Sequence, residues 1–126
     1  MEAGALLRSV VTRNVPNHVR VNAAQKLITL FSLREHEEAI VRSCGSYFMQ
    51  LEPLLFVHNS PELQECIAKL LGYLGSLRDR ETFMAWILGH LESADLHQVQ
   101  GGLIGCARAF VSSVDSRRHG ASIHII

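Results

Sequence analysis

A helical motif that occurs three times is the feature that most constrains this chain. The clearest copy is Leu63–Leu74, and weaker copies are Val19–Leu30 and Val99–Phe110. The copies therefore start roughly 40 residues apart, at residues 19, 63 and 99. Recurrence of one helical unit at this interval is typical of an α-solenoid, in which neighbouring units stack and build an extended surface.

Composition agrees with a packed helical domain. The chain has 126 residues, which suits one domain, and 48% of them are hydrophobic. Lys plus Arg and Asp plus Glu each number 12, so the net charge of zero provides no overall attraction for nucleic acid or an anionic membrane. No apolar run approaches the ~20 residues that span a bilayer, and the first residues do not resemble a signal peptide. We expect no membrane association.

The three cysteines, Cys44, Cys66 and Cys106, are far apart and form no CxxC or His/Cys motif. They are typical of reduced thiols that fill space in a core. We therefore expect an intracellular protein of the cytoplasm or nucleus, not a secreted one.

Apolar periodicity and capping residues predict an all-α fold. The expected helices cover residues 2–12, 18–31, 32–44, 47–57, 61–74, 80–91 and 96–114. Cys44–Ser46 should interrupt the helices, and Pro53 should kink one or stand in the first turn of a helix that begins near Glu52. Ser60 is the expected cap of the helix that begins at Pro61.

The same periodicity predicts the buried faces. For residues 18–31, with Asn17 as the cap, the face is Val19, Ala23, Leu27 and Leu30. For residues 61–74 it is Leu63, Ile67, Leu70, Leu71 and Leu74. Residues 75–79 should link two helices and residues 93–95 should form a turn. We expect one helical domain over residues 1–114 and a flexible tail over residues 115–126.

The middle unit resembles an armadillo repeat. Gly45, Pro53–Leu55, the Asn59–Ser60 turn and Leu63–Leu74 follow one another in that family's order and approximate spacing, and Arg34–Val41 resembles its short first helix. The first unit is more similar to the second helix of a HEAT repeat, through Pro16, Val19, Arg20, Ala23 and Ala24. This resemblance covers most of residues 14–111. It implies a short right-handed α-solenoid of about three repeats.

The resemblance further implies protein binding along a concave face lined by the last helix of each unit. The implied stripe is Val21, Gln25, Thr29, Glu65, Lys69, Tyr73, Gly101, Gly105 and Ala109. Peptide-binding armadillo proteins carry a Trp on this helix and an Asn four residues later. Here the Trp positions hold Gln25, Lys69 and Gly105, and the Asn positions hold Thr29, Tyr73 and Ala109. An extended peptide is therefore disfavoured, and the chain is interpreted as an interaction or scaffold module for an unknown protein partner.

No pattern in the chain predicts an enzyme, a cofactor or a metal site. The seven histidines lack the i, i+4 pair of a zinc helix, and His36 with Glu35, Glu37 and Glu38 reads as a solvated helix face. Gly101, Gly102 and Gly105 follow no strand, so they indicate close helix packing rather than a phosphate loop.

The alternative function is nucleic-acid association. An arginine-rich edge could contact phosphates through Arg78, Arg80, Arg108, Arg117, Arg118 and His119. Acidic residues interspersed along the same segments dilute this charge. Phe83 and Trp86 are expected to pack between repeats rather than to stack on bases.

The C-terminal end of the repeats is expected to lack a cap. Residues 112–126 are too few for another unit, and internal units leave an apolar face for a neighbour. Trp86, Leu103 and Phe110 should then be incompletely covered. This predicts either self-association or a place in a longer solenoid.

Overall fold

The computed structural model describes residues 3–56, 60–92 and 102–115, and all regular structure in this part is helical. The elements are α1 (Ala3–Val11), α2 (Asn17–Ser32), the 3-10 helix η1 (Arg34–His36), α3 (Glu37–Leu55), α4 (Pro61–Leu77), α5 (Arg80–Leu91) and a helix over residues 102–115. Within the described ranges there is no strand, so the predicted all-α class is confirmed.

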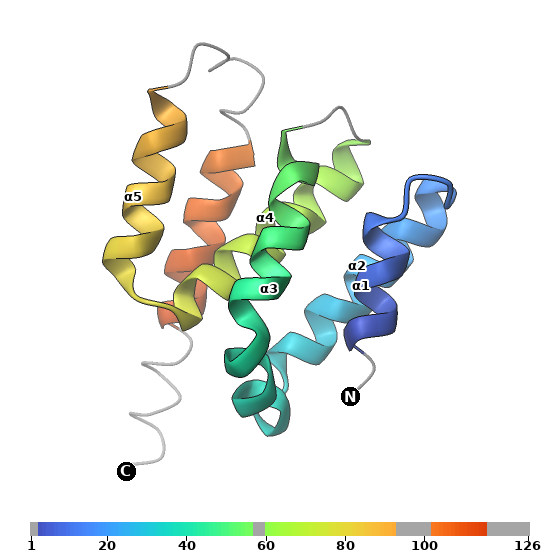
Figure 1. Ribbon diagram of the computed structural model, residues 1–126, viewed down its shortest axis with the longest axis horizontal. Helices are drawn as coiled ribbons and strands as arrows, with labels where there is room; N and C mark the ends of the chain where they lie inside the picture. The colour runs from blue at the N-terminus through green and yellow to red at the C-terminus, as the bar shows by residue number, and fades with distance from the viewer. Residues whose placement is uncertain (1–2, 57–59, 93–101, 116–126) are drawn as a thin grey trace.

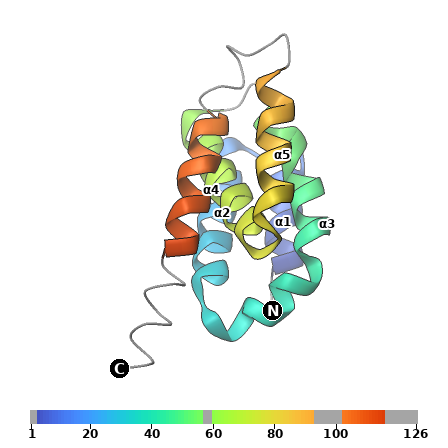
Figure 2. The same cartoon turned by 90° about the vertical axis from the view of Figure 1, so that its left-hand side faces the viewer.

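The helices lie side by side in pairs (Figure 1). α1 packs along α2, and α3 packs along α4. α4 lies in the middle, where it also contacts α2, α5 and the helix over residues 102–115. α5 and that last helix form one end of the molecule (Figure 2).

The structure of α4 confirms the predicted start and core of this helix. Ser60 Oγ accepts a hydrogen bond from the Leu63 backbone N at 3.2 Å, and Pro61 occupies the first turn. The five predicted core residues of α4 are each at most 1% exposed. The expected linker at 75–79 is wrong at its start, because α4 continues to Leu77. Gly75 packs against the Phe83 ring, which holds this last turn in place.

The predicted break at Cys44–Ser46 is wrong, because α3 runs unbroken through Gly45. A glycine costs a helix about 1 kcal/mol. Here the cost is offset by one continuous buried face of Ile40, Cys44, Phe48, Leu51 and Leu55. Pro53 lies in the last turn of α3 instead of starting a helix, so its missing N–H removes one hydrogen bond near the end.

The predicted buried face of α2 is partly wrong. Val19 is 39% exposed, and Arg20 and Val21 are buried beside the predicted Ala23 and Leu27. The guanidinium Nε of Arg20 donates to the Val10 carbonyl at 2.8 Å, which satisfies a carbonyl in the last turn of α1. α2 contacts α1 on one side and α4 on another, so its buried face is wider than a single stripe.

Small residues bring α4 and the helix over residues 102–115 into close contact. A β-carbon added at Gly72 would lie 2.5 Å from the Ala109 β-carbon and 2.8 Å from the Phe110 backbone N. One added at Gly105 would lie 3.0 Å from the Ala68 β-carbon. The close helix packing predicted for Gly105 is therefore confirmed, while Gly101 lies outside the described residues.

The C-terminal end is covered differently from the prediction. Leu103 and Phe110 are buried at 2% and 8% exposure, and Phe110 stacks on Phe83 with ring centroids 4.3 Å apart. Trp86 is half-buried, and its Nε1 donates to Glu52 Oε2 at 2.7 Å. The expected exposure of Leu103 and Phe110 was wrong. Other apolar side chains are exposed there instead, namely Met84, Leu88, Leu91, Ile104 and Val111. The expected turn at 93–95 and residues 116–126 of the expected tail lie outside the described residues.

Candidate functional site

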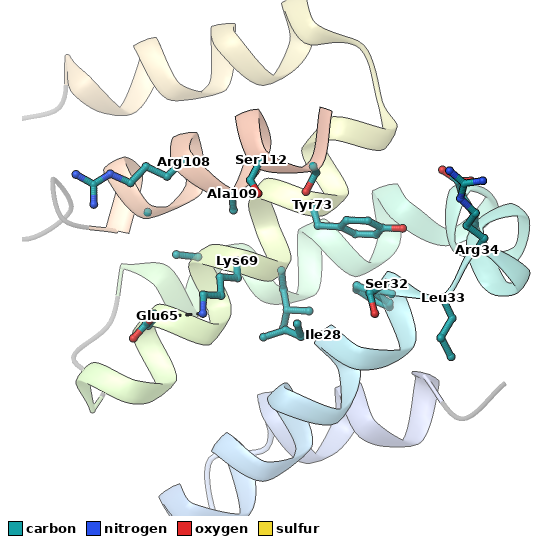
Figure 3. A pocket seen from close by; sticks show the side chains of 16 residues that line it. Ile28, Ser32, Leu33, Arg34, Glu65, Lys69, Tyr73, Arg108, Ala109 and Ser112 are labelled. Carbon is teal, nitrogen blue, oxygen red and sulfur yellow. Dashed lines mark ion pairs between the residues drawn. The ribbon is translucent and has the colours of Figure 1, made fainter. Parts of the chain in front are cut away.

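A groove of about 770 Å³ runs between α2, α4 and the helix over residues 102–115 (Figure 3). Ala68, Leu70 and Tyr73 of α4 contribute its apolar centre. Ile28 and Phe31 come from α2 on one side, and the last helix closes the other side. This volume lies within the range typical of small-molecule pockets, roughly 300–1,000 Å³.

Five of the predicted concave-face residues line this groove. They are Glu65, Lys69, Tyr73, Gly105 and Ala109, from two helices that are far apart in the sequence. The predicted stripe on α4 and the last helix therefore faces this groove, and a binding role for these residues stays a prediction.

The predicted stripe of α2 does not face the groove. Val21 is buried in the core at 8% exposure, and Gln25 and Thr29 are exposed but do not line the groove. α2 turns Ile28 and Ser32 toward the groove instead. Each residue rotates a helix by about 100°, so an error of one position is enough to move a stripe off this surface.

Tyr73 is more embedded than the predicted exposed position implied. Its ring stacks on Phe31 with centroids 5.6 Å apart and an interplanar angle of 24°. Phe31 also stacks on Tyr47, at 6.0 Å. Tyr73 is half-buried as a result, and it forms a rigid aromatic surface in the groove (Figure 3).

Charged side chains stand at both ends of the groove. Lys69 Nζ lies 3.3 Å from Glu65 Oε1, and Arg108 stands at the same end (Figure 3). Arg34 of η1 stands at the opposite end, and Glu37 of α3 also lines the groove. The Lys69–Glu65 pair is more than half exposed and spaced i, i+4, so it contributes little to stability.

Several lining residues were missed by the sequence analysis. Arg108 and Ser112 lie three and seven positions after Gly105, so extending the predicted stripe along its own helix would have found them. Leu33 and Arg34 belong to the connection between α2 and α3, and no repeat pattern indicates that this connection reaches the groove.

Burial disfavours the thiolate forms of Cys66 and Cys106. Burial raises the pKa of the Cys106 thiol to about 12. Burial is also the largest cause of the raised pKa of Cys66, although Lys69 opposes it. Both side chains pack in the core as predicted, and so does Cys44. In the part of the chain that the structure describes, no three His, Cys, Asp or Glu side chains form a group suited to a metal ion.

The predicted arginine edge is divided by the fold. Arg108 lines the groove, whereas Arg78 and Arg80 flank the connection between α4 and α5 and do not line it. Between them, the Asp79 carboxylate caps α5 by accepting from the Thr82 backbone N at 2.6 Å. Arg117, Arg118 and His119 lie outside the described residues.

Comparisons of the chain with protein-family models, curated proteins and solved structures found no match.

In residues 3–56, 60–92 and 102–115, no helix combines the length and hydrophobicity needed to cross a membrane.

Proposed function

We propose that this chain is a short α-solenoid of armadillo/HEAT-like repeats that binds a protein partner in the groove between α2, α4 and the helix over residues 102–115. The groove is the observation that carries this proposal. It unites residues from separate helical pairs into one concave surface with an apolar centre and charged ends.

The chemistry of the groove favours binding over catalysis. Its centre offers apolar and aromatic contact area, and its charged side chains stand toward the ends, which is the arrangement of a protein interface with a desolvated centre and a polar rim. A solenoid would account for the shared groove, because stacking of repeated units places one helix of each unit on the same face.

Blocking the groove tests this proposal. Ser112 lines the groove and is exposed, so Ser112→Trp should fill it without disturbing the core. Ser46 is an exposed serine of α3 that does not line the groove, so Ser46→Trp is the matched control. Both variants and the wild type are used for quantitative affinity capture from cells.

A protein partner of the groove should be retained by Ser46→Trp and lost with Ser112→Trp, while both variants melt like the wild type. If every captured protein is retained equally by the two variants, the groove is not the binding surface. Retention on heparin that decreases steeply with salt, and that Ser112→Trp leaves unchanged, would instead support the nucleic-acid alternative through the outlying arginines.

A further inference from the structure

We infer that the groove takes an amphipathic helix of about two to three turns, with acidic side chains at its Lys69 and Arg108 end. This inference rests on the proposed function and specifies the chemistry of the partner segment. Neither an extended peptide nor a nucleic acid fits the same observations as well.

The groove favours a helix because it offers little to an unpaired peptide backbone. Ile28, Ala68 and Tyr73 contribute apolar contact area, and the uncharged polar lining consists of serine and tyrosine hydroxyls with no Asn or Gln side chain. Helices and the connection at Leu33 form its lining, and the described residues contain no strand edge to pair with. An extended segment would satisfy only part of its backbone N–H and C=O groups against this lining, whereas a helix satisfies them internally.

The size of the groove sets the length of the helix. The lining residues of α4 extend from Glu65 to Tyr73, which corresponds to about 12 Å at 1.5 Å per residue. Two turns of a bound helix cover that distance, which includes the charged end at Glu65 and Lys69, and a third turn would extend toward Arg34. Apolar side chains spaced i, i+3 or i+4 would then contact Ile28 and Tyr73.

The charge around the groove selects acidic side chains at one end. Arg108 has no ion-pair partner among the described residues. Lys69 stands at the same end, and its exposed pair with Glu65 is weak enough to be exchanged for a partner carboxylate. Two cations against one carboxylate make this end attractive to acidic residues, although the whole chain is neutral.

The probe is a fluorescein-labelled, hydrocarbon-stapled helical peptide with leucines on one face and glutamates beside them at one end. Three comparison peptides carry lysines in place of the glutamates, a scrambled leucine pattern, or a central D-proline that prevents the helix. Binding is followed by fluorescence anisotropy with the wild type, Arg108→Glu, Ser112→Trp and Ser46→Trp.

The acidic helix should bind the wild type at least tenfold more tightly than each comparison peptide. Arg108→Glu should reverse the preference between acidic and basic peptides, Ser112→Trp should weaken both, and Ser46→Trp should change neither. Equal binding of the D-proline peptide would overturn the helical occupant. An unchanged charge preference in Arg108→Glu would overturn the acidic one.

The outcome is separable from that of the proposed function. Absence of any peptide binding overturns this inference, while a cellular partner lost only with Ser112→Trp would still support a protein-binding groove. Displacement of the acidic helix by an equimolar single-stranded DNA oligonucleotide would assign Lys69 and Arg108 to phosphate and also overturn it.

Discussion

Adding a single methyl group at Gly72 should destabilise this protein, although the same change at Gly45 should stabilise it. Gly72 lies within α4, where it meets the helix over residues 102–115. A β-carbon there would lie 2.5 Å from the Ala109 β-carbon and 2.8 Å from the Phe110 backbone N. These neighbours belong to a helix backbone and a rigid methyl group, so neither can rotate away. The two helices must separate, and they form one side of the groove.

The two opposing contributions can be estimated. Replacing Gly by Ala inside a helix gains about 1 kcal/mol from backbone entropy and helix propensity. Overpacking of a tight contact costs about 1–3 kcal/mol, and a contact with backbone belongs at the upper end of this range or above it. Gly72→Ala should therefore lower the free energy of unfolding by about 1–2 kcal/mol.

Gly45→Ala is the matched control. Gly45 also lies inside a helix, α3, but an added β-carbon there would meet nothing within 4 Å. It should raise the free energy of unfolding by about 0.5–1 kcal/mol. In a domain of this size, 1 kcal/mol shifts the melting temperature by roughly 3–6 °C.

Thermal melts followed by circular dichroism at 222 nm, with urea titrations for the free energies, should therefore shift in opposite directions for Gly72→Ala and Gly45→Ala. If Gly72→Ala stabilises the protein as much as Gly45→Ala does, the helices are not in contact at this position. The glycine-mediated packing behind the groove would then be wrong.

The remaining predictions concern the core, a cap, the thiols and the exposed end. Leu71→Ala should lower the free energy of unfolding by about 2–5 kcal/mol, because Leu71 is fully buried. Lys69→Ala should leave the urea midpoint nearly unchanged, because Lys69 is exposed. The reverse order of the two effects would refute the register of α4. Hydrogen bonds from Thr82 lower the pKa of Asp79, so its capping stabilises the fold above the ordinary pKa of 3.8 and is lost as the pH falls through the lowered value. The melting temperatures of wild type and Asp79→Ala should accordingly differ at pH 7 and start to converge only as the pH falls below 3.8, and a constant difference would contradict this. Because the pKa of Cys106 is raised to about 12, this thiol should stay protonated and resist alkylation at pH 8 until urea unfolds the chain. Rapid labelling of Cys106 in the native state would contradict its burial. If the exposed apolar end self-associates, sedimentation velocity should detect concentration-dependent association that Leu88→Lys abolishes, whereas a monomer at all concentrations would exclude it.

The sequence was sufficient for the features that depend on local chemistry and on a strong apolar pattern. α4 is the clearest case, because a Ser–Pro start and one strongly apolar face determine its beginning and its core. The predicted bounds of α5 agree with the structure, in which Asp79 caps the helix and Leu91 ends it. The predicted stripe also contained five residues of α4 and the last helix that line the groove, because residues spaced i, i+4 lie on one face of a helix.

Only the tertiary structure decided the features in which packing overrides local preference. Gly45 breaks a helix by propensity, but a buried face on both sides of it holds α3 together. Arg20 is charged, yet it is buried because the Val10 carbonyl of another helix accepts from it. Arg34 reaches the groove from a connection between helices, and helical periodicity does not predict the position of such a connection. A sequence pattern records which face of a helix is apolar. The directions from which other helices approach, and therefore the shape of the groove, depend on contacts between residues far apart in the chain.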